Sequence, residues 1–286
     1  MEKLKIIIQL TRLNKPIGFM LLFWPCLWGL TLGYYFVNET SIYFNYIILF
    51  FLGSVLMRSA GCIFNDIVDR DFDKKVERTK NRPIASGKIS VFESFIYVAI
   101  LCLTSLLILL QFNKLTIILG MSSMFLAFTY PFMKRITYWP QLFLGLTFNW
   151  GIIMAWAAVN NNISYEIIAL YISAIFWTLG YDTIYGAQDM KDDEIIGIKS
   201  TSIKFKENIK LFVGSSYFLT LIILGYLFKH ELGINILTFL FILFASSLLF
   251  QLIQFEKTKP EKCLMAFKMN NFSGLILFLG ILSRNL

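Results

Sequence analysis

Carboxylate side chains gather in two short windows of a sequence that is otherwise strongly apolar. Ten of the eighteen Asp and Glu residues lie in 66–77 and 182–194, although 57% of the chain is hydrophobic. Carboxylates that crowd together repel one another unless a cation lies among them. Hard cations such as Mg²⁺ and Ca²⁺ prefer oxygen ligands. The two windows therefore predict a cation site built from both.

In the first window, helical spacing of about 100° per residue places four polar side chains within an arc of roughly 100°. These residues are Asn65, Asp66, Asp69 and Asp73. Asp71 points away from them, whereas Arg58, seven residues before Asn65, shares their face. An arginine inside an apolar span is costly and usually faces a cavity or a partner, so we expect Arg58 to be functional.

In the second window, a continued helix would place Asp182, Asp189 and Asp193 within roughly 40° of one another. Tyr185 and Asp192 lie at the edge of that face. Two such faces brought together would offer six or more oxygen ligands, and Mg²⁺ usually completes its shell with substrate phosphates. The sequence therefore favours a metal-bound phosphate over a closed metal cage.

Basic residues surround both windows, although for any single lysine membrane topology is the better explanation of the charge. They are Lys74, Lys75, Arg78, Lys80, Arg82, Lys134, Arg135, Lys191 and Lys199. Carboxylate pairs fringed by Arg and Lys are typical of a metal-bound diphosphate, whose remaining oxygens the cations neutralise.

The elements that must position these residues are membrane-spanning helices. Mean hydropathy is +0.66 and only 15% of residues are charged, against about 25% in a soluble domain. Nine apolar stretches reach the length of about 17–25 residues that a span needs. The predicted spans are 17–36, 43–64, 91–111, 115–133, 139–159, 164–184, 211–228, 233–253 and 264–283. We therefore predict an all-α, polytopic membrane protein, a single domain over 1–286 that forms a nine-transmembrane-helix bundle.

The hydrophilic loops after the second and sixth spans each open with an acidic cluster and continue into a basic stretch. This layout recurs four spans apart and indicates a weak internal repeat, with halves at 17–133 and 139–253 and a final span at 264–283. Repeats of this kind place sites at their interface.

The distribution of charge predicts the orientation in the membrane. A net charge of +8 would suggest nucleic acid as the partner of a soluble protein, but all basic residues except Lys114, Lys229 and Arg284 lie in or beside the N-terminal tail and alternate loops. This asymmetry predicts a cytoplasmic N-terminus, cytoplasmic acidic windows and an external C-terminus. Residues 1–16 show no cleavage site and form either a surface amphipathic helix, with Ile6, Leu10 and Leu13 on one face, or a charged flank. The lack of a transit-like presequence favours a bacterial inner membrane.

A bundle with 29 Phe can shelter a long apolar tail beside the diphosphate site. Polyprenyl diphosphate combines the two features. Its diphosphate departs with help from metal and cations, and an electron-rich acceptor captures the allylic carbocation once water is excluded. The four cysteines form no CxxC pair and the single histidine, His230, lies in a short loop, so we expect neither a thiolate metal site nor a histidine base.

The chain resembles the UbiA superfamily of intramembrane aromatic prenyltransferases nearly from end to end. The first family motif, NDxxDxxxD, stands at 65–73, the second reads YDTIYGAQDMKDDEIIGIKST, and a YxxxK element runs from Tyr130 to Lys134. The stretches TRLNKPIGFMLLFWPCLWG and RSAGCIFNDIVDRDFDKKVERTKNRPIASGKIS look most like the 4-hydroxybenzoate polyprenyltransferases of ubiquinone biosynthesis. Gly186 stands where the family's pattern has Ala, a small-for-small departure.

The resemblance implies Mg²⁺ dependence and transfer of a polyprenyl chain to the ring carbon ortho to the hydroxyl of 4-hydroxybenzoate. The residues implied to hold Mg²⁺ are Asn65, Asp66, Asp69, Asp73, Asp189, Asp192 and Asp193. Those implied to bind substrate are Arg58, Arg82, Tyr130, Lys134, Arg135, Tyr185 and Lys199. Those implied to act in catalysis are Arg58, Asp69, Asp73, Asp189 and Asp193. Arg58 is expected to take the benzoate carboxylate, where a planar bidentate donor is favoured.

Three alternatives remain open from the sequence. Another superfamily acceptor (homogentisate, a naphthoate or haem) would leave the same diphosphate site. A cation transporter would also use carboxylates, but near the membrane midplane rather than at helix ends beside basic residues. The proton acceptor is either an aspartate such as Asp189 or the released diphosphate. Expected partners are the two substrates, membrane lipid and other enzymes of the ubiquinone pathway, and no nucleic acid.

Overall fold

The computed structural model describes residues 2–35 and 40–285, and in these ranges the chain is helical without strands. Within them, nine helices are long and apolar enough to cross a membrane, which confirms the predicted fold class. They are α2 (Ile17–Tyr34), α3 (Thr40–Asp73), α4 (Val91–Leu109), α5 (Lys114–Ile136), α6 (Pro140–Asn160), α7 (Tyr165–Gly186), α10 (Ile209–Leu227), α11 (Ile236–Gln254) and α12 (Pro260–Leu282). The shorter elements are α1 (Glu2–Thr11), α8 (Met190–Ile196), α9 (Thr201–Lys204) and the 3₁₀-helix η1 (Ser283–Asn285).

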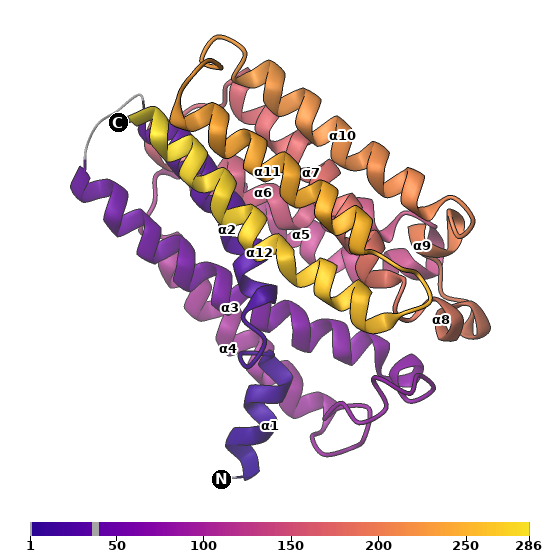
Figure 1. The fold of residues 1–286 in the computed structure, drawn as a ribbon. Coiled ribbons are helices and arrows are strands. Elements are labelled where there is room, and N and C mark those ends of the chain that lie inside the picture. Colours follow the sequence, from indigo (N-terminus) through magenta and orange to yellow (C-terminus); the bar gives the residue numbers. More distant parts are fainter. Residues whose placement is uncertain (1, 36–39, 286) are drawn as a thin grey trace.

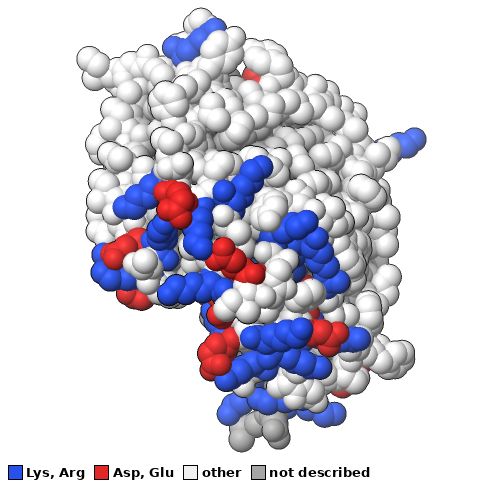
Figure 2. Space-filling view, turned by 90° about the vertical axis from the view of Figure 1, so that its right-hand side faces the viewer, with Lys and Arg blue, Asp and Glu red and all other residues white. Residues whose placement is uncertain are grey.

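The long helices run back and forth between two ends of the bundle (Figure 1). One end, called the charged end below, carries α1, the segment 74–90 that follows α3, and the segment 187–208 with α8 and α9. Figure 2 shows basic and acidic side chains gathered over the lower part of the molecule, while its upper part is mostly uncharged.

The centre of the bundle is formed by α2, α6 and α7, which pack against one another. A Cβ at Gly29 of α2 would lie 2.2 Å from the carbonyl oxygen of Ile152 in α6, so only glycine allows this close approach. Trp28 and Trp177 are both fully buried, and their rings lie 5.0 Å apart between α2 and α7. This packing fixes the helices that carry the polar residues.

The helices begin where the sequence supplies capping groups. The hydroxyl of Ser90 accepts a hydrogen bond from the backbone N–H of Glu93 at 3.1 Å, and the side chain of Asn113 accepts one from Thr116 at 2.9 Å. Such caps satisfy backbone donors that lack a partner in the first turn. They set the start of α4 and α5.

Most predicted boundaries lie within three residues of the structure, and three predictions differ from it by more. α3 continues to Asp73 instead of ending at 64, so the first acidic window belongs to a span's own helix. α12 begins at Pro260 rather than 264. The prediction that 182–193 is one continuous helix is wrong, because α7 ends at Gly186 and a turn leads into α8. Residue 36 of the first predicted span lies outside the described residues.

The N-terminal helix expected from the sequence is present as α1, but its apolar face contacts protein. Leu10 is 1% exposed and packs with Ile63 and Ile67 of α3, together with partly buried Ile6. Leu13 remains exposed. The internal repeat stays a prediction.

Candidate active site

A cavity of about 1050 Å³ lies inside the bundle at the charged end and is lined mainly by side chains of α2 to α7, with others from α1, α8, α12 and the segments 74–90 and 187–208. Its inner wall is apolar and includes Phe50, Leu106, Met121 and Met154. Its outer part is highly polar. The predicted site residues that line it are Arg58, Asn65, Asp66, Asp69, Asp73, Arg82, Tyr130, Lys134, Tyr185, Asp189 and Asp193. The fold thus brings the two acidic windows to one cavity.

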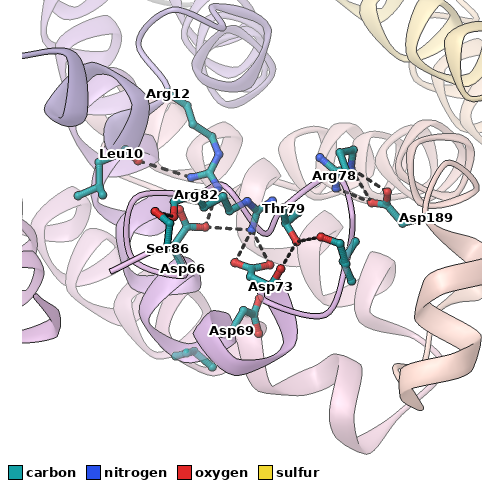
Figure 3. Close-up of polar contacts among 12 residues, drawn as sticks. Leu10, Arg12, Asp66, Asp69, Asp73, Arg78, Thr79, Arg82, Ser86 and Asp189 are labelled. Atoms are coloured by element: carbon teal, nitrogen blue, oxygen red, sulfur yellow. Dashed lines mark hydrogen bonds and ion pairs between the residues drawn. The ribbon is translucent and has the colours of Figure 1, made fainter. Parts of the chain in front are cut away.

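Three aspartates of the first window, Asp66, Asp69 and Asp73, are almost fully buried, and arginines hold Asp66 and Asp73 (Figure 3). Nη2 of Arg12 donates to Oδ1 of Asp66 at 2.6 Å. Nη1 of Arg82 donates to the same oxygen at 3.1 Å and to both oxygens of Asp73 at 3.0 and 2.9 Å. Burial of charge is tolerated here because each carboxylate is paired and hydrogen-bonded.

Asp69, the third aspartate of this window, is also buried. Nζ of Lys134 donates to its Oδ2, and Nη2 of Arg135 lies 3.7 Å from its Oδ1. Oδ1 of Asp69 and Oδ2 of Asp66 are nonetheless buried without any hydrogen-bond partner. A buried carboxylate oxygen without a partner is costly, so these two atoms are open acceptor positions for a cation.

The second window is held by one bidentate pair. Nε of Arg78, from the segment 74–90, donates to the two carboxylate oxygens of Asp189 at 2.7 and 3.1 Å. In Figure 3 this pair lies on the opposite side of the site from Arg12. Burial, together with the neighbouring Asp189 carboxylate, raises the pKa of Asp193 to about 7. Asp192 lies outside the cavity lining. The two windows are therefore linked through Arg78.

Two predicted substrate-binding residues also lie outside the lining and make other contacts. Arg135 donates to the backbone carbonyl of Val68 at 2.6 Å and lies over the ring of Phe72. Lys199 donates to the carbonyl of Ile136 at 3.1 Å. In this arrangement both side chains join helix ends, and their contact with substrate stays a prediction.

The structure adds cavity residues to which sequence reasoning assigned no role. Arg12 follows α1 with a positive φ of 55°, and no sequence signal links it to Asp66, 54 residues away. Burial and the positive charges of Arg12, Arg78 and Arg82 lower the pKa of Lys15, which makes no ion pair with any residue in the described ranges. An unpaired lysine next to three arginines leaves an excess of positive charge, which indicates a site for phosphate oxygens.

Asp182 of α7 also lines the cavity. Its signal in the sequence was an acidic residue inside an apolar span, on the predicted face of Asp189. An ionisable side chain at such a place is a functional candidate by default.

The carboxylates of the cavity fit Mg²⁺ by their chemistry but are not arranged around a metal ion. Among residues 2–35 and 40–285, no group of three His, Cys, Asp or Glu side chains is arranged to hold a metal ion. The reason is physical, because Arg12, Arg82, Lys134 and Arg78 each bind a carboxylate that would otherwise face a metal. The carboxylate oxygens are nevertheless hard ligands of the type that Mg²⁺ prefers, and two of them lack hydrogen-bond partners. The residues therefore fit Mg²⁺ chemically, provided that the ion displaces basic side chains.

The fold and the cavity together define an intramembrane enzyme for a substrate with an anionic head and an apolar tail. The family model described as "UbiA prenyltransferase family" matches residues 22–273. The chain belongs to the UbiA prenyltransferase family.

Curated relatives match over almost the whole chain. It is 42% identical to "4-hydroxybenzoate octaprenyltransferase" of Vibrio vulnificus (strain CMCP6), over 98% of this chain and 97% of the relative. It is also 42% identical to "4-hydroxybenzoate polyprenyltransferase, mitochondrial" of Rattus norvegicus, over 98% of this chain and 74% of the relative.

Solved structures share the fold at lower identity. A UbiA homolog from Aeropyrum pernix K1 in its apo form has a TM-score of 0.78 at 22% identity, covering 93% of this chain and 98% of that one. A UbiA homolog from Archaeoglobus fulgidus bound to GPP and Mg²⁺ has a TM-score of 0.70 at 18% identity, covering 97% and 99%. The nine-helix architecture is thus that of the family.

Proposed function

We propose that this protein transfers a polyprenyl chain from polyprenyl diphosphate to 4-hydroxybenzoate, at the ring carbon ortho to the hydroxyl, and releases diphosphate in ubiquinone biosynthesis. The observation that carries the proposal is one cavity that joins buried carboxylates and basic side chains to an apolar wall. Relatives named for this reaction, at 42% identity over nearly the full chain, support the acceptor.

The two aspartate windows are the proposed Mg²⁺ site. Its proposed ligands are Asn65, Asp66, Asp69, Asp73, Asp189 and Asp193, with Asp192 in support. When bound, Mg²⁺ supplies positive charge where negative charge develops on the departing diphosphate. The homolog bound to GPP and Mg²⁺ has the same fold, which supports this assignment.

The basic side chains of the cavity hold the diphosphate in this proposal. Arg82 and Lys134 exchange their carboxylate partners for phosphate oxygens, and Arg12 and Lys15 add charge from the segment before α2. Such charge-assisted hydrogen bonds are about twice as strong as neutral ones. The apolar wall receives the polyprenyl tail and excludes water that would hydrolyse the carbocation.

Arg58 is the proposed partner of the acceptor's carboxylate. Its guanidinium lies over the ring of Phe148 at 5.1 Å, and its Nε is buried without a hydrogen-bond partner. A planar donor fork matches a carboxylate, and the aromatic ring beneath it suits an arylcarboxylate.

The proposed location is the bacterial inner membrane, with the charged end in the cytoplasm and the C-terminus outside. Basic residues concentrated at the charged end support this orientation through the positive-inside rule. Protease accessibility of a C-terminal tag on intact spheroplasts tests it.

The test of function uses membranes that contain the protein, labelled 4-hydroxybenzoate, polyprenyl diphosphates of several lengths and Mg²⁺, with and without EDTA. The expected result is label that enters the organic phase only with Mg²⁺. Transfer to homogentisate, a naphthoate or haem instead would keep the diphosphate site and replace the acceptor. If no polyprenyl diphosphate were consumed with any of these acceptors, the proposed prenyltransferase activity would be wrong.

A further inference from the structure

Two charged side chains that lie on spanning helices and line the cavity, Arg58 and Asp182, have no ion-pair partner among the described residues. Arg58 of α3 makes no hydrogen bond through its buried Nε, and Asp182 of α7 makes no hydrogen bond or salt bridge in the same part of the chain. The two interact electrostatically but are not in contact as a salt bridge. Both side chains therefore face the same cavity without pairing with each other.

Such an arrangement is costly inside a membrane protein. An ionisable residue within a span is normally paired with an opposite charge or faces a functional cavity. The other cavity aspartates on spanning helices are paired, and so is Asp189 beyond the end of α7. Asp66 and Asp73 bind Arg82, Asp69 binds Lys134, and Asp189 binds Arg78.

The chemistry of Arg58 and Asp182 limits which molecule can bind to both. The occupant must carry an anion at one end, for the guanidinium, and a hydrogen-bond donor at the other, for the carboxylate. 4-Hydroxybenzoate has these two groups at opposite ends of a flat ring. This step rests on the proposed function.

Tyr130 connects this pair of side chains to the diphosphate site. It lines the cavity on α5, one helical turn before Lys134, whose ammonium group binds Asp69. Because Asp69 belongs to the first window, we expect a ring bound to Arg58 and Asp182 to lie near the place where the allylic carbon is released.

We infer that Asp182 receives the phenol hydroxyl of the acceptor while Arg58 holds its carboxylate. As the C–O bond to diphosphate breaks, its electron pair leaves with the diphosphate. A π pair of the ring forms the new bond to the allylic carbon, and the hydroxyl proton passes to Asp182, which leaves a ring ketone. The ring proton at the substituted carbon then leaves with the diphosphate, and Asp182 returns its proton to the oxygen.

Asp182 is thus a catalytic residue that touches the acceptor and makes the ring more electron-rich at the ortho carbon. It differs from Asp189, which is engaged by both oxygens with Arg78. General-base assistance of this kind contributes about 10²–10⁴-fold in rate.

The experiment compares Asp182→Asn with the unchanged protein on two acceptors, 4-hydroxybenzoate and its 3-fluoro derivative. The more acidic fluorinated phenol loses its hydroxyl proton without help. The expected loss is about 10²-fold in kcat on 4-hydroxybenzoate and clearly less on the fluorinated acceptor. Asp182→Glu should restore part of the rate, because it restores the carboxylate.

Controls separate this inference from folding and from the proposed function. Asp71→Asn, at an exposed side chain outside the cavity, is the matched control and should keep the wild-type rate. Thermal stabilisation by Mg²⁺ with an unreactive polyprenyl thiodiphosphate should be equal in Asp182→Asn and wild type. A full rate in Asp182→Asn, or an equal loss on both acceptors, would overturn the inference. Failure of the wild type on both acceptors, with donor stabilisation intact, would overturn the proposed acceptor instead.

Discussion

The two acidic windows meet in one cavity but are built in different ways. The first lies on α3, a single helix whose last turns carry Asp66, Asp69 and Asp73, with side chains that are at most 9% exposed. The second lies across the turn between α7 and α8, where the side chain of Asp189 is 16% exposed and is held by one arginine from a loop. The first window is buried on one continuous helix, whereas the second depends on a single, partly exposed ion pair. We therefore expect the first side of the site to be preorganised and the second to open for substrate.

The largest effect is expected at the preorganised side. Asp69→Asn keeps the shape of the side chain but removes the charge, so the fold should remain and prenyl transfer should fall by about 10³-fold, as for a lost electrostatic catalyst. Transfer to 4-hydroxybenzoate is measured alongside thermal stability in detergent. Asp71→Asn again serves as control, and an undiminished rate in Asp69→Asn would refute its assignment to the metal site.

The difference between the windows also explains what the sequence could predict. A helical period is regular, so the common face of Asn65, Asp66, Asp69 and Asp73 followed from spacing alone and holds in α3. The second face was derived from the same rule and failed, because α7 ends at Gly186. A Cβ at Gly186 would lie 2.8 Å from Oγ of Ser202, so this helix end depends on a packing partner that local spacing does not reveal.

Contacts between distant segments could not be predicted either, because local spacing does not reveal which segments pack together. Arg12 and Asp66 are joined only by the way α1 packs on α3, and Arg78 reaches Asp189 across 111 positions of sequence. Asp182 stood out as an acid in a span, but its relation to Arg58 depends on the cavity. Residue type could predict the chemistry of the site, whereas pairing required the tertiary structure.

A substitution of Arg78 tests the expected opening of the second window. Arg78→Gln removes the bidentate hydrogen bonds to Asp189, so the segment 74–90 should exchange its amide hydrogens faster and the KM for the donor should rise about tenfold. Hydrogen exchange by mass spectrometry and initial rates measure the two effects. Because chemistry depends on the first window, kcat should change less than KM. A change in kcat alone would mean that Arg78 acts in the chemical step, and the proposed difference between the two windows would be wrong.

We expect the Mg²⁺ requirement of the enzyme to depend on pH through Asp193 of the second window. Burial, with help from the Asp189 carboxylate, raises the pKa of Asp193 to about 7. The group is neutral below that pH, and a neutral carboxyl is a poor Mg²⁺ ligand, so affinity falls as pH falls. Between pH 8 and 6.5 the Mg²⁺ concentration for half-maximal rate should rise about fourfold. Asp193→Asn should bind Mg²⁺ more weakly at every pH and lose this dependence; an unchanged pH profile in that variant would assign the titration to another group.

The smallest effect is expected at Arg12, because the first window holds its aspartates redundantly. Asp66 accepts hydrogen bonds from both Arg12 and Arg82, so Arg12→Gln leaves one cation on the buried carboxylate. Because Arg82 still neutralises this carboxylate, the KM for the donor should rise only about twofold. Arg12→Gln and Arg78→Gln remove the same charge and form a matched pair, assayed side by side at one Mg²⁺ concentration. A larger effect from Arg12 than from Arg78 would mean that α1, rather than the segment 74–90, closes the site, and the roles assigned to the two windows would exchange.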